Sequence, residues 1–219
     1  MKHLFAVGDI HGCFDSLKEL IERNIQLDKN DKLILLGDYI DRGDKSKEVV
    51  DYITDLQEKD YDITPLIGNH ELLLLETLED EKNKPKWIKN GGDETLKSFG
   101  ISSIKDIPPK YLYFFTNLKN YLSIDNYLFV HAGFNDKILN PFQDTYSMAW
   151  KSQVEYLNPL LAGKTIIHGH RPITVEHCEK QINDNKPIIN IDTGCVYKEN
   201  AGHGKLTAIE LYSKKLFSV

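Results

Sequence analysis

Short apolar runs, each followed at once by polar residues and glycine, recur along the first 170 residues. They are Leu4 to Val7, Leu33 to Leu36, Pro65 to Ile67, Tyr127 to Val130 and Thr165 to Ile167. Continuous apolar runs of this length predict strands buried on both faces. Each run leads into Asp, Asn or His. Because open α/β sheets bind ligands at the carboxyl ends of their strands, we expect these polar side chains to form one site.

Helical periodicity separates the first three runs. Apolar residues recur every three or four positions after the first run (Phe14, Leu17, Leu20, Ile21) and after the second (Val49, Val50, Ile53, Leu56). Ser46 lies near the start of the second helix, where a hydroxyl can cap free amides. The third strand, Ile63 to Ile67, contains Pro65, which indicates an edge position or a bulge. This β-α-β-α-β order predicts an α/β fold with a largely parallel core sheet.

The pattern changes at about residues 72–125, where we predict a mostly helical insertion. Leu72 to Leu78 has helical character, Glu79 to Pro85 is a charged break, and Trp87, the stretch Asn90 to Asp93 and an aromatic cluster follow. Two interpretations of Trp87 and the tyrosines stay open: they form the insertion's own core, or they bind substrate. Because the polar strand ends run from residue 9 to residue 170, we expect one domain over residues 1–219.

Strands return after the insertion. The apolar runs are Tyr127 to Val130, Lys164 to Ile167, Ile188 to Ile191 and Leu206 to Leu211. No periodic helix separates the last two, so we expect them to form an antiparallel hairpin or meander through Gly194 to Gly204.

Composition narrows the classes of function. The formal charge of −6 argues against a nucleic-acid partner, since such binding needs a basic face. No apolar run approaches the ~18 residues of a membrane span, and the first residues turn acidic too soon for a signal peptide. We therefore predict a cytoplasmic protein without a membrane partner. Cys13, Cys178 and Cys195 lack CxxC spacing and are interpreted as reduced thiols. The sequence does not indicate an oligomeric state.

The polar strand ends form a mixed oxygen and nitrogen donor set without thiolate: Asp9, His11, Asp38, Asn69, His131 and His170. Such donors suit manganese, iron or zinc, whereas calcium and magnesium prefer oxygen alone. Six donors are too many for one closed tetrahedral zinc site. The count indicates two ions, which could hold a hydroxide between them and clamp both ends of a displacement at phosphorus.

The motifs GDIHG, GDYIDRG, GNHE, HAG and GH, in this order over residues 8–170, resemble the phosphoprotein phosphatase family of calcineurin-like metallophosphoesterases, in its small bacterial branch. The resemblance implies a four-layer α/β/β/α sandwich with two mixed β-sheets around two metals, of which manganese is the expected one. It assigns Asp9 and His11 to one ion, Asp38 as the bridge, and the other donors to the second ion (Asn69, His131, His170). It also makes His70 the acid that protonates the leaving oxygen, Asp41 the residue that orients His70, and Arg42 the phosphate ligand.

Some residues keep two interpretations. Asp9 or Asp38 alone would be an ordinary turn residue, and a lone His131 or His170 an ordinary core histidine, so only their joint occurrence argues for a site. Glu71 either makes a supporting hydrogen bond or is a plain acid at a helix N-terminus. The sequence departs from the family pattern at two positions where relatives commonly carry an arginine. Ile67 stands just before the glycine of GNHE, and after the HAG motif the matching cation is Lys151. With three arginines in the chain, bidentate binding of phosphate rests on Arg42.

Three functions follow from these residues, in descending order. The first is metal-dependent hydrolysis of phosphomonoesters, foremost phosphoserine and phosphothreonine in proteins, by a hydroxide that bridges two metals. The alternative keeps the metals and changes the substrate to a dinucleoside polyphosphate such as diadenosine tetraphosphate. The third is an inactive regulatory protein. The expected partner is therefore a phosphoprotein or a small phosphoester, bound at Arg42 and Lys151.

Overall fold

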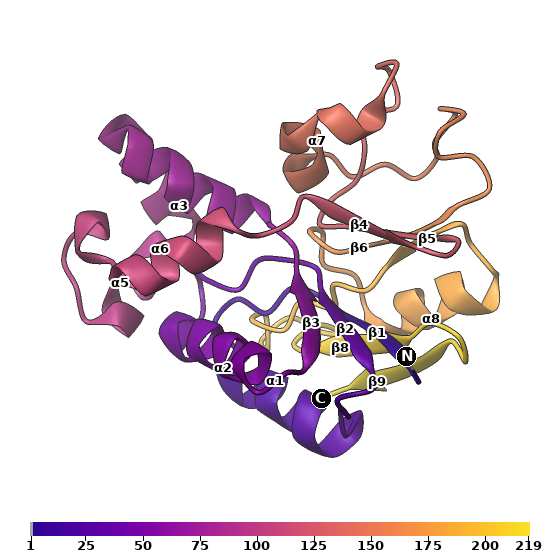
Figure 1. Ribbon diagram of the computed structural model, residues 1–219, viewed down its shortest axis with the longest axis horizontal. Coiled ribbons are helices and arrows are strands. Elements are labelled where there is room, and N and C mark those ends of the chain that lie inside the picture. Colours follow the sequence, from indigo (N-terminus) through magenta and orange to yellow (C-terminus); the bar gives the residue numbers. More distant parts are fainter. Residues whose placement is uncertain (1) are drawn as a thin grey trace.

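Two β-sheets pack face to face in the computed structural model, which describes residues 2–219 (Figure 1). The first sheet has the order β3-β2-β1-β8-β9, with β1, β2 and β3 parallel and β8 and β9 antiparallel to their neighbours. The second has the order β4-β5-β6-β7, in which β4 alone is antiparallel. The expected α/β fold with two mixed sheets is confirmed.

The strands are short, and most of their residues are buried. Their bounds are β1 Leu4–Val7, β2 Lys32–Leu35, β3 Asp62–Pro65, β4 Tyr121–Ile124, β5 Tyr127–Val130, β6 Thr165–His168, β7 Ile188–Asn190, β8 Thr207–Glu210 and β9 Lys215–Ser218. Strand β1 is buried at every position because its two faces meet different layers. Leu4 and Ala6 join the core between the sheets, whereas Phe5 and Val7 join the core under the first helices. This two-sided burial explains why the strands have continuous apolar sequences.

Helices cover the outer faces of the two sheets, and one helix contributes to the core between them. Helices α1 (Phe14–Glu19, continued by a π-type turn at Leu20–Asn24) and α2 (Ser46–Glu58) lie over the first sheet, with the predicted apolar residues of α2 buried against it. Helix α7 (Thr145–Trp150), preceded by a 3₁₀ turn at Pro141–Gln143, packs Met148 onto the second sheet. Helix α8 (Val175–Asn183) contributes Cys178 and Ile182 to the core between the sheets.

A run of helices occupies one side of the sheets between β3 and β4 (Figure 1). It comprises α3 (Asn69–Glu79), α4 (Lys84–Trp87), α5 (Asp93–Phe99) and α6 (Pro109–Thr116), with short turns at Glu81–Asn83, Ile88–Gly92 and Ile104–Asp106. Its aromatic residues are buried in the same apolar cluster as the apolar residues of α2; they include Trp87, Tyr111 and Phe115. We call residues 69–117 the helical segment.

Three details of the predicted elements are wrong. Strands β7 and β8 do not pair: β7 lies in the second sheet and β8 in the first, and the hairpin is formed by β8 with β9. The chain therefore crosses between sheets at residues 191–206, a step that periodicity cannot reveal. Strand β4 begins at Tyr121, before the predicted return to strands. Ser46 does not cap α2, because its hydroxyl accepts a hydrogen bond from the Asp41 amide at 3.1 Å.

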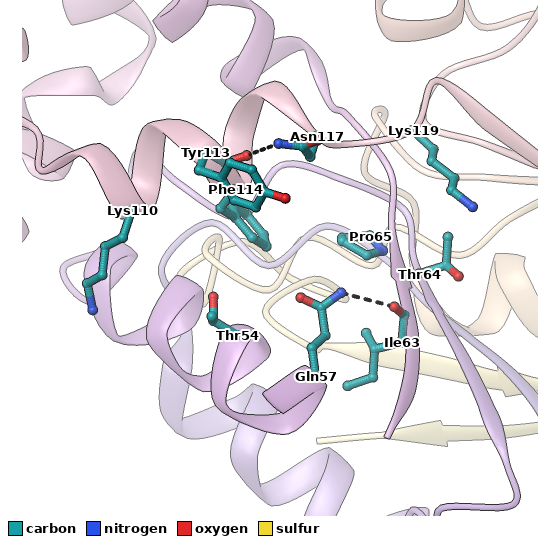
Figure 2. A pocket seen from close by; sticks show the side chains of 10 residues that line it. All are labelled: Thr54, Gln57, Ile63, Thr64, Pro65, Lys110, Tyr113, Phe114, Asn117 and Lys119. Atoms are coloured by element: carbon teal, nitrogen blue, oxygen red, sulfur yellow. Dashed lines mark hydrogen bonds between the residues drawn. The ribbon is translucent and has the colours of Figure 1, made fainter. Parts of the chain in front are cut away.

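Strand β3 is the outer strand of its sheet, as Pro65 indicated. A groove of about 310 Å³ runs along its free edge between α2 and α6 (Figure 2). Gln57 closes part of this edge by donating its side-chain amide to the Ile63 carbonyl at 3.1 Å, which limits strand pairing with another chain. None of the predicted ligands lines the groove. Within residues 2–219 no helix combines the length and the apolar character needed to cross a membrane.

Candidate metal centre

The predicted ligands meet where strands of both sheets end. Asp9 and Asp38 follow β1 and β2, His131 and His170 follow β5 and β6, and Asn69 begins α3 after β3. These side chains are buried apart from His170, which is partly exposed. The parallel strands of each sheet end on the same side, and the two sheets place these ends next to each other. Residues 161 positions apart therefore come into contact: the His170 amide donates a hydrogen bond to Asp9 Oδ2 at 3.0 Å.

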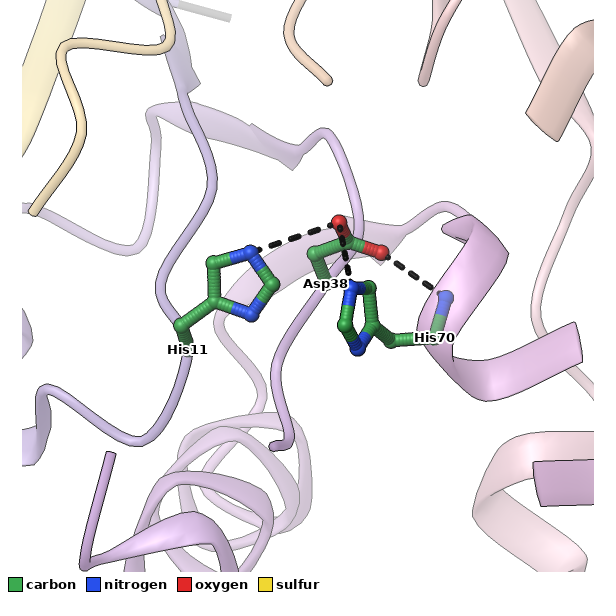
Figure 3. A group of neighbouring side chains, drawn as sticks. All are labelled: His11, Asp38 and His70. Atoms are coloured by element: carbon green, nitrogen blue, oxygen red, sulfur yellow. Dashed lines mark hydrogen bonds and ion pairs between the residues drawn. The ribbon is translucent and has the colours of Figure 1, made fainter. Parts of the chain in front are cut away.

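Asp38 lies between two groups of potential metal donors. One group is His11, Asp38 and His70, shown in Figure 3, and the other is Asp38, His131 and His170. Within each group the donor atoms lie within 4.8 Å of one another. The Asp38 carboxylate oxygen Oδ2 is 3.5 Å from His11 Nε2 and 3.4 Å from His131 Nε2. A carboxylate shared by two donor groups is the arrangement expected of a bridging ligand.

The hydrogen bonds of the histidines favour a cation at this place. Nδ1 of His131 faces the Leu36 carbonyl at 2.9 Å, so that nitrogen carries the proton. Its Nε2 then presents a lone pair, yet it faces two acceptors: Asn69 Oδ1 at 3.0 Å and Asp38 Oδ2. His11 is held in the same way, with Nδ1 donating to the Ile40 carbonyl at 3.0 Å. At His131 Nε2, acceptor atoms thus converge without a proton between them, which fits a divalent metal ion.

Buried carboxylates give the same indication. Burial and the charges of Asp192 and Asp38 raise the pKa of Asp9 well above its usual value. Burial and the charge of Asp38 raise the pKa of Asp192 to about 7, although a hydrogen bond from the Gly194 amide lowers it. Acidic groups with raised pKa values become stable as anions when a divalent cation neutralises them. The residues present therefore fit two divalent ions.

Asp192 is a residue that the sequence analysis missed. It lies two residues after the end of β7 and is 2% exposed, and its charge acts on Asp9. The signal was present, since the apolar run Ile188 to Ile191 ends in Asp192, Thr193 and Gly194. Assigning that run to a hairpin hid its likeness to the other strand ends.

Glu71 has a supporting position, which decides between its two interpretations. Its carboxylate accepts hydrogen bonds from the backbone amides of Asp38 (2.9 Å), Tyr39 (2.8 Å) and Gly68 (2.9 Å). Burial and the charge of Asp38 raise its pKa to about 8. Helix α3 thereby fixes the turn that presents Asp38.

The backbone of the site is itself unusual. His11, Asp38, Asp41, Arg42 and His170 all have positive φ angles, between 46° and 72°. Residues with side chains rarely adopt this region, and when they do so in a cluster the cluster commonly marks a functional site.

His70 and Asp41 form a buried pair beside the donor groups. His70 Nδ1 lies 2.7 Å from Asp41 Oδ2, and both side chains are fully buried. His70 Nε2 is buried with no hydrogen-bond partner among residues 2–219, at 4.0 Å from Asp38 Oδ2 (Figure 3). Burial lowers the pKa of His70, but the charges of Asp38 and Asp41 outweigh it and raise the pKa above its ordinary value. The arrangement leaves Nε2 free either to bind a metal or to carry a proton.

The two predicted phosphate ligands differ in position. Arg42 lies at the site: its Nη1 is 2.7 Å from His11 Nε2, and its guanidinium lies 5.7 Å above the ring of Tyr197. Lys151 is exposed at the end of α7, and its charge adds to hydrogen bonds from Ser147 and Asn135 that lower the pKa of Asp144. Lys151 thus has an electrostatic effect on Asp144, and its substrate role stays a prediction.

Comparisons with known proteins agree with this geometry. Residues 2–195 match the family model for calcineurin-like phosphoesterases. A curated relative from Nitrosospira multiformis, a symmetrical bis(5'-nucleosyl)-tetraphosphatase, is 31% identical over 132 residues, which are 59% of this chain and 43% of the relative. Other curated relatives with the same name are 34–43% identical over shorter stretches. The matches span 25–43% of the length of these relatives.

Solved structures share the fold across different activities. A protein provisionally described as a diadenosine tetraphosphatase superposes with a TM-score of 0.67 at 20% identity, over 99% of this chain and 92% of that one. A serine/threonine phosphatase from Saccharomyces cerevisiae has a TM-score of 0.62 at 16% identity, over 99% and 78% of the two chains. Likeness at this identity establishes the fold and leaves the substrate to other arguments.

Proposed function

Since the chain belongs to the calcineurin-like phosphoesterases, we propose that it is a metal-dependent hydrolase that cleaves dinucleoside tetraphosphates symmetrically. The reaction rests on one observation, the sharing of Asp38 by two donor groups. The substrate rests on the curated relatives, which are named as symmetrical tetraphosphatases. This choice reverses the order of the two substrates expected from the motifs alone, where phosphoserine and phosphothreonine came first.

The surface beside the site has room for a nucleoside. A groove of about 730 Å³ is lined by Ser152, His168 and Arg171, of which Arg171 is the neighbour of His170 in the chain. Ser152 Oγ is buried there without a hydrogen-bond partner among residues 2–219. Arg171 and Lys186 add positive charge to this groove, which Glu155 partly offsets. These features suit the phosphate and sugar of a nucleotide better than they suit inorganic phosphate alone.

The reaction adds water to a phosphorus atom and breaks the central P–O–P bridge. Two divalent ions, when bound by the donor groups, would activate the attacking water and neutralise the phosphoryl oxygens. Arg42 can direct its planar fork at two phosphoryl oxygens. His70 Nε2 can deliver the proton to the leaving oxygen, because Asp41 accepts the proton on Nδ1 and fixes the ring.

A product assay tests this proposal. Protein reconstituted with Mn²⁺ receives diadenosine tetraphosphate or a phosphoserine peptide, and the products are separated by chromatography. We expect two molecules of ADP per diadenosine tetraphosphate, faster turnover than of the peptide, and loss of activity with a chelator. Asp38→Asn protein, purified in parallel, controls for contaminating phosphatases. ATP with AMP as products, or faster release of phosphate from the peptide, would overturn the assigned substrate.

A further inference from the structure

The buried carboxylate of Asp41 is held by more than its histidine. Besides His70, it accepts hydrogen bonds from Trp87 Nε1, at 3.0 Å to Oδ2 and 3.2 Å to Oδ1, and from Thr95 Oγ1, at 2.5 Å to Oδ1. Asp41, Trp87 and Thr95 are all 0% exposed. Both additional donors come from the helical segment, 46 and 54 residues along the chain.

Thr95 binds the backbone of the same residue as well as its side chain. Its hydroxyl oxygen accepts a hydrogen bond from the Asp41 amide at 2.9 Å while its hydrogen is directed to the Asp41 carboxylate. The φ angle of Asp41 is +69°, a conformation that costs free energy for a residue with a side chain. Thr95 therefore secures both the strained turn and the direction of the carboxylate that leaves it.

The stretch Trp87 to Thr95 is shaped around this turn. Gly91 has φ +98°, and its carbonyl accepts a hydrogen bond from the Arg42 amide at 3.2 Å. A Cβ atom at Gly92 would collide with the indole ring of Trp87. The two glycines thus let the backbone come close enough to place Trp87 on one side of the Asp41 carboxylate and Thr95 on the other.

We propose that Trp87 and Thr95 are positioning residues for the reaction, which hold the Asp41 carboxylate in the one orientation that aligns His70. The inference rests on the proposed function for the role of His70 and goes beyond it in assigning a task to the helical segment. A carboxylate held by His70 alone could rotate about its own side-chain bonds. Donors on its remaining lone pairs prevent that rotation, so the imidazole stays directed at the leaving oxygen.

The alternative is that Trp87 and Thr95 only fill the core. The two roles differ in one chemical respect. A misaligned acid slows the departure of a poor leaving group, which needs the proton, and spares a good one, which leaves without it. Loss of packing would instead lower stability and affect both substrates alike.

The test uses a pair of variants at one position with a matched control. Thr95→Val removes the hydroxyl and keeps the shape, and Thr95→Ser restores the hydroxyl. Thr77→Val is the control, because Thr77 is equally buried in the helical segment, yet its hydroxyl bonds only to the Leu73 carbonyl, at 2.7 Å. Trp87→Phe provides a second test if Thr95→Val does not fold. Each metal-loaded protein is assayed with phenyl phosphate and p-nitrophenyl phosphate, whose leaving groups are poor and good.

We expect Thr95→Val to lower kcat for phenyl phosphate roughly 10- to 100-fold, a part of the 10²–10⁴-fold typical of acid catalysis, and to change kcat for p-nitrophenyl phosphate less than about threefold. Thr95→Ser and Thr77→Val should stay close to the wild type. Equal losses on both substrates, or loss in Thr77→Val as large as in Thr95→Val, would overturn the inference.

A second measurement does not depend on activity. In metal-free protein labelled with ¹⁵N-histidine, the Nδ1 proton of His70 should give an NMR signal that is absent from His70→Gln. We expect this signal to shift or broaden in Thr95→Val and to persist in Thr95→Ser and Thr77→Val. An unchanged signal in Thr95→Val would contradict the inference. Failure of the wild type to cleave diadenosine tetraphosphate would count against the proposed function instead, and the NMR measurement, which needs no turnover, would still test the inference.

Discussion

The strand ends and the helical segment supply the two halves of this site in different ways. Asp9, Asp38, His131 and His170 follow strands, so the hydrogen-bonded sheets fix where their backbones lie. His70 and its partners depend on helices that reach Asp41 across 29 to 54 residues of sequence. The two regions therefore have different roles. The strand ends, with Asn69 at the first position of α3, hold the proposed ions, and the rest of the helical segment aligns the proposed acid.

The largest effect should come from the residue on which the strand half depends most. Asp38→Asn removes the shared carboxylate, so we expect metal content to fall well below two ions per chain and activity to drop at least about 10³-fold. His70→Asn, in the helical half, should retain the ions and lose activity. Metal analysis of the two purified variants tests this prediction. An empty site in His70→Asn would show that His70 is a metal ligand and that the helical segment also holds the ions.

Arg42 lies at the turn between the two halves and should show the next largest effect. We expect Arg42→Ala to lower both kcat and kcat/KM by about 10²–10³-fold, because a donor directed at the phosphoryl oxygens is lost as charge develops there. Arg42→Lys should recover little, since an ammonium cannot replace the fork. Steady-state kinetics with thermal melts provide the measurement. A variant that melts early with near-normal kcat would show that Arg42 only braces its loop.

Glu71 connects the two regions, because it belongs to helix α3 and yet holds the turn that follows strand β2. Glu71→Gln places an NH₂ group against backbone amides that need an acceptor, so we expect metal affinity to weaken about 10- to 100-fold. Glu79→Gln, on an exposed turn of the same helix α3, is the matched control. Metal titration by calorimetry gives both affinities. If the Glu71→Gln variant and the control bind metal with equal affinity, Glu71 does not support the metal ligands.

The smallest effect should come from replacing Tyr197, whose ring packs against the guanidinium of Arg42. Tyr197→Leu removes a cation–π contact worth about 0.5–1 kcal/mol, so we expect kcat/KM to fall about two- to fivefold. Tyr197→Phe keeps the ring and should resemble the wild type. If Phe and Leu lower kcat/KM equally, the hydroxyl and not the ring face serves Arg42.

The two halves also differ in what their sequences reveal. Asp9, Asp38 and His131 could be predicted because each follows an apolar run, and the same pattern would have found Asp192. The contacts of Thr95 and Trp87 with Asp41 have no local pattern, since they arise when helices distant in sequence pack together. The resemblance to known phosphatases correctly implied two mixed sheets, whereas the crossing from β7 to β8 was missed because both strands are apolar and short. The assigned roles of the ligands and of His70 stay predictions.

The pairing of β1 with β8 has a consequence for how the protein is made. Phe5 is opposite Glu210 in the first sheet, so one edge of β1 meets its partner only after some 200 further residues have been synthesised. Contacts this distant in sequence slow folding, because a long chain must close before they stabilise anything. Until then the nascent chain carries an apolar strand with an open edge, the kind of edge that pairs with other chains. Strand β1, which leads into Asp9 of the proposed metal site, therefore gains its second partner only when nearly the whole chain has been made.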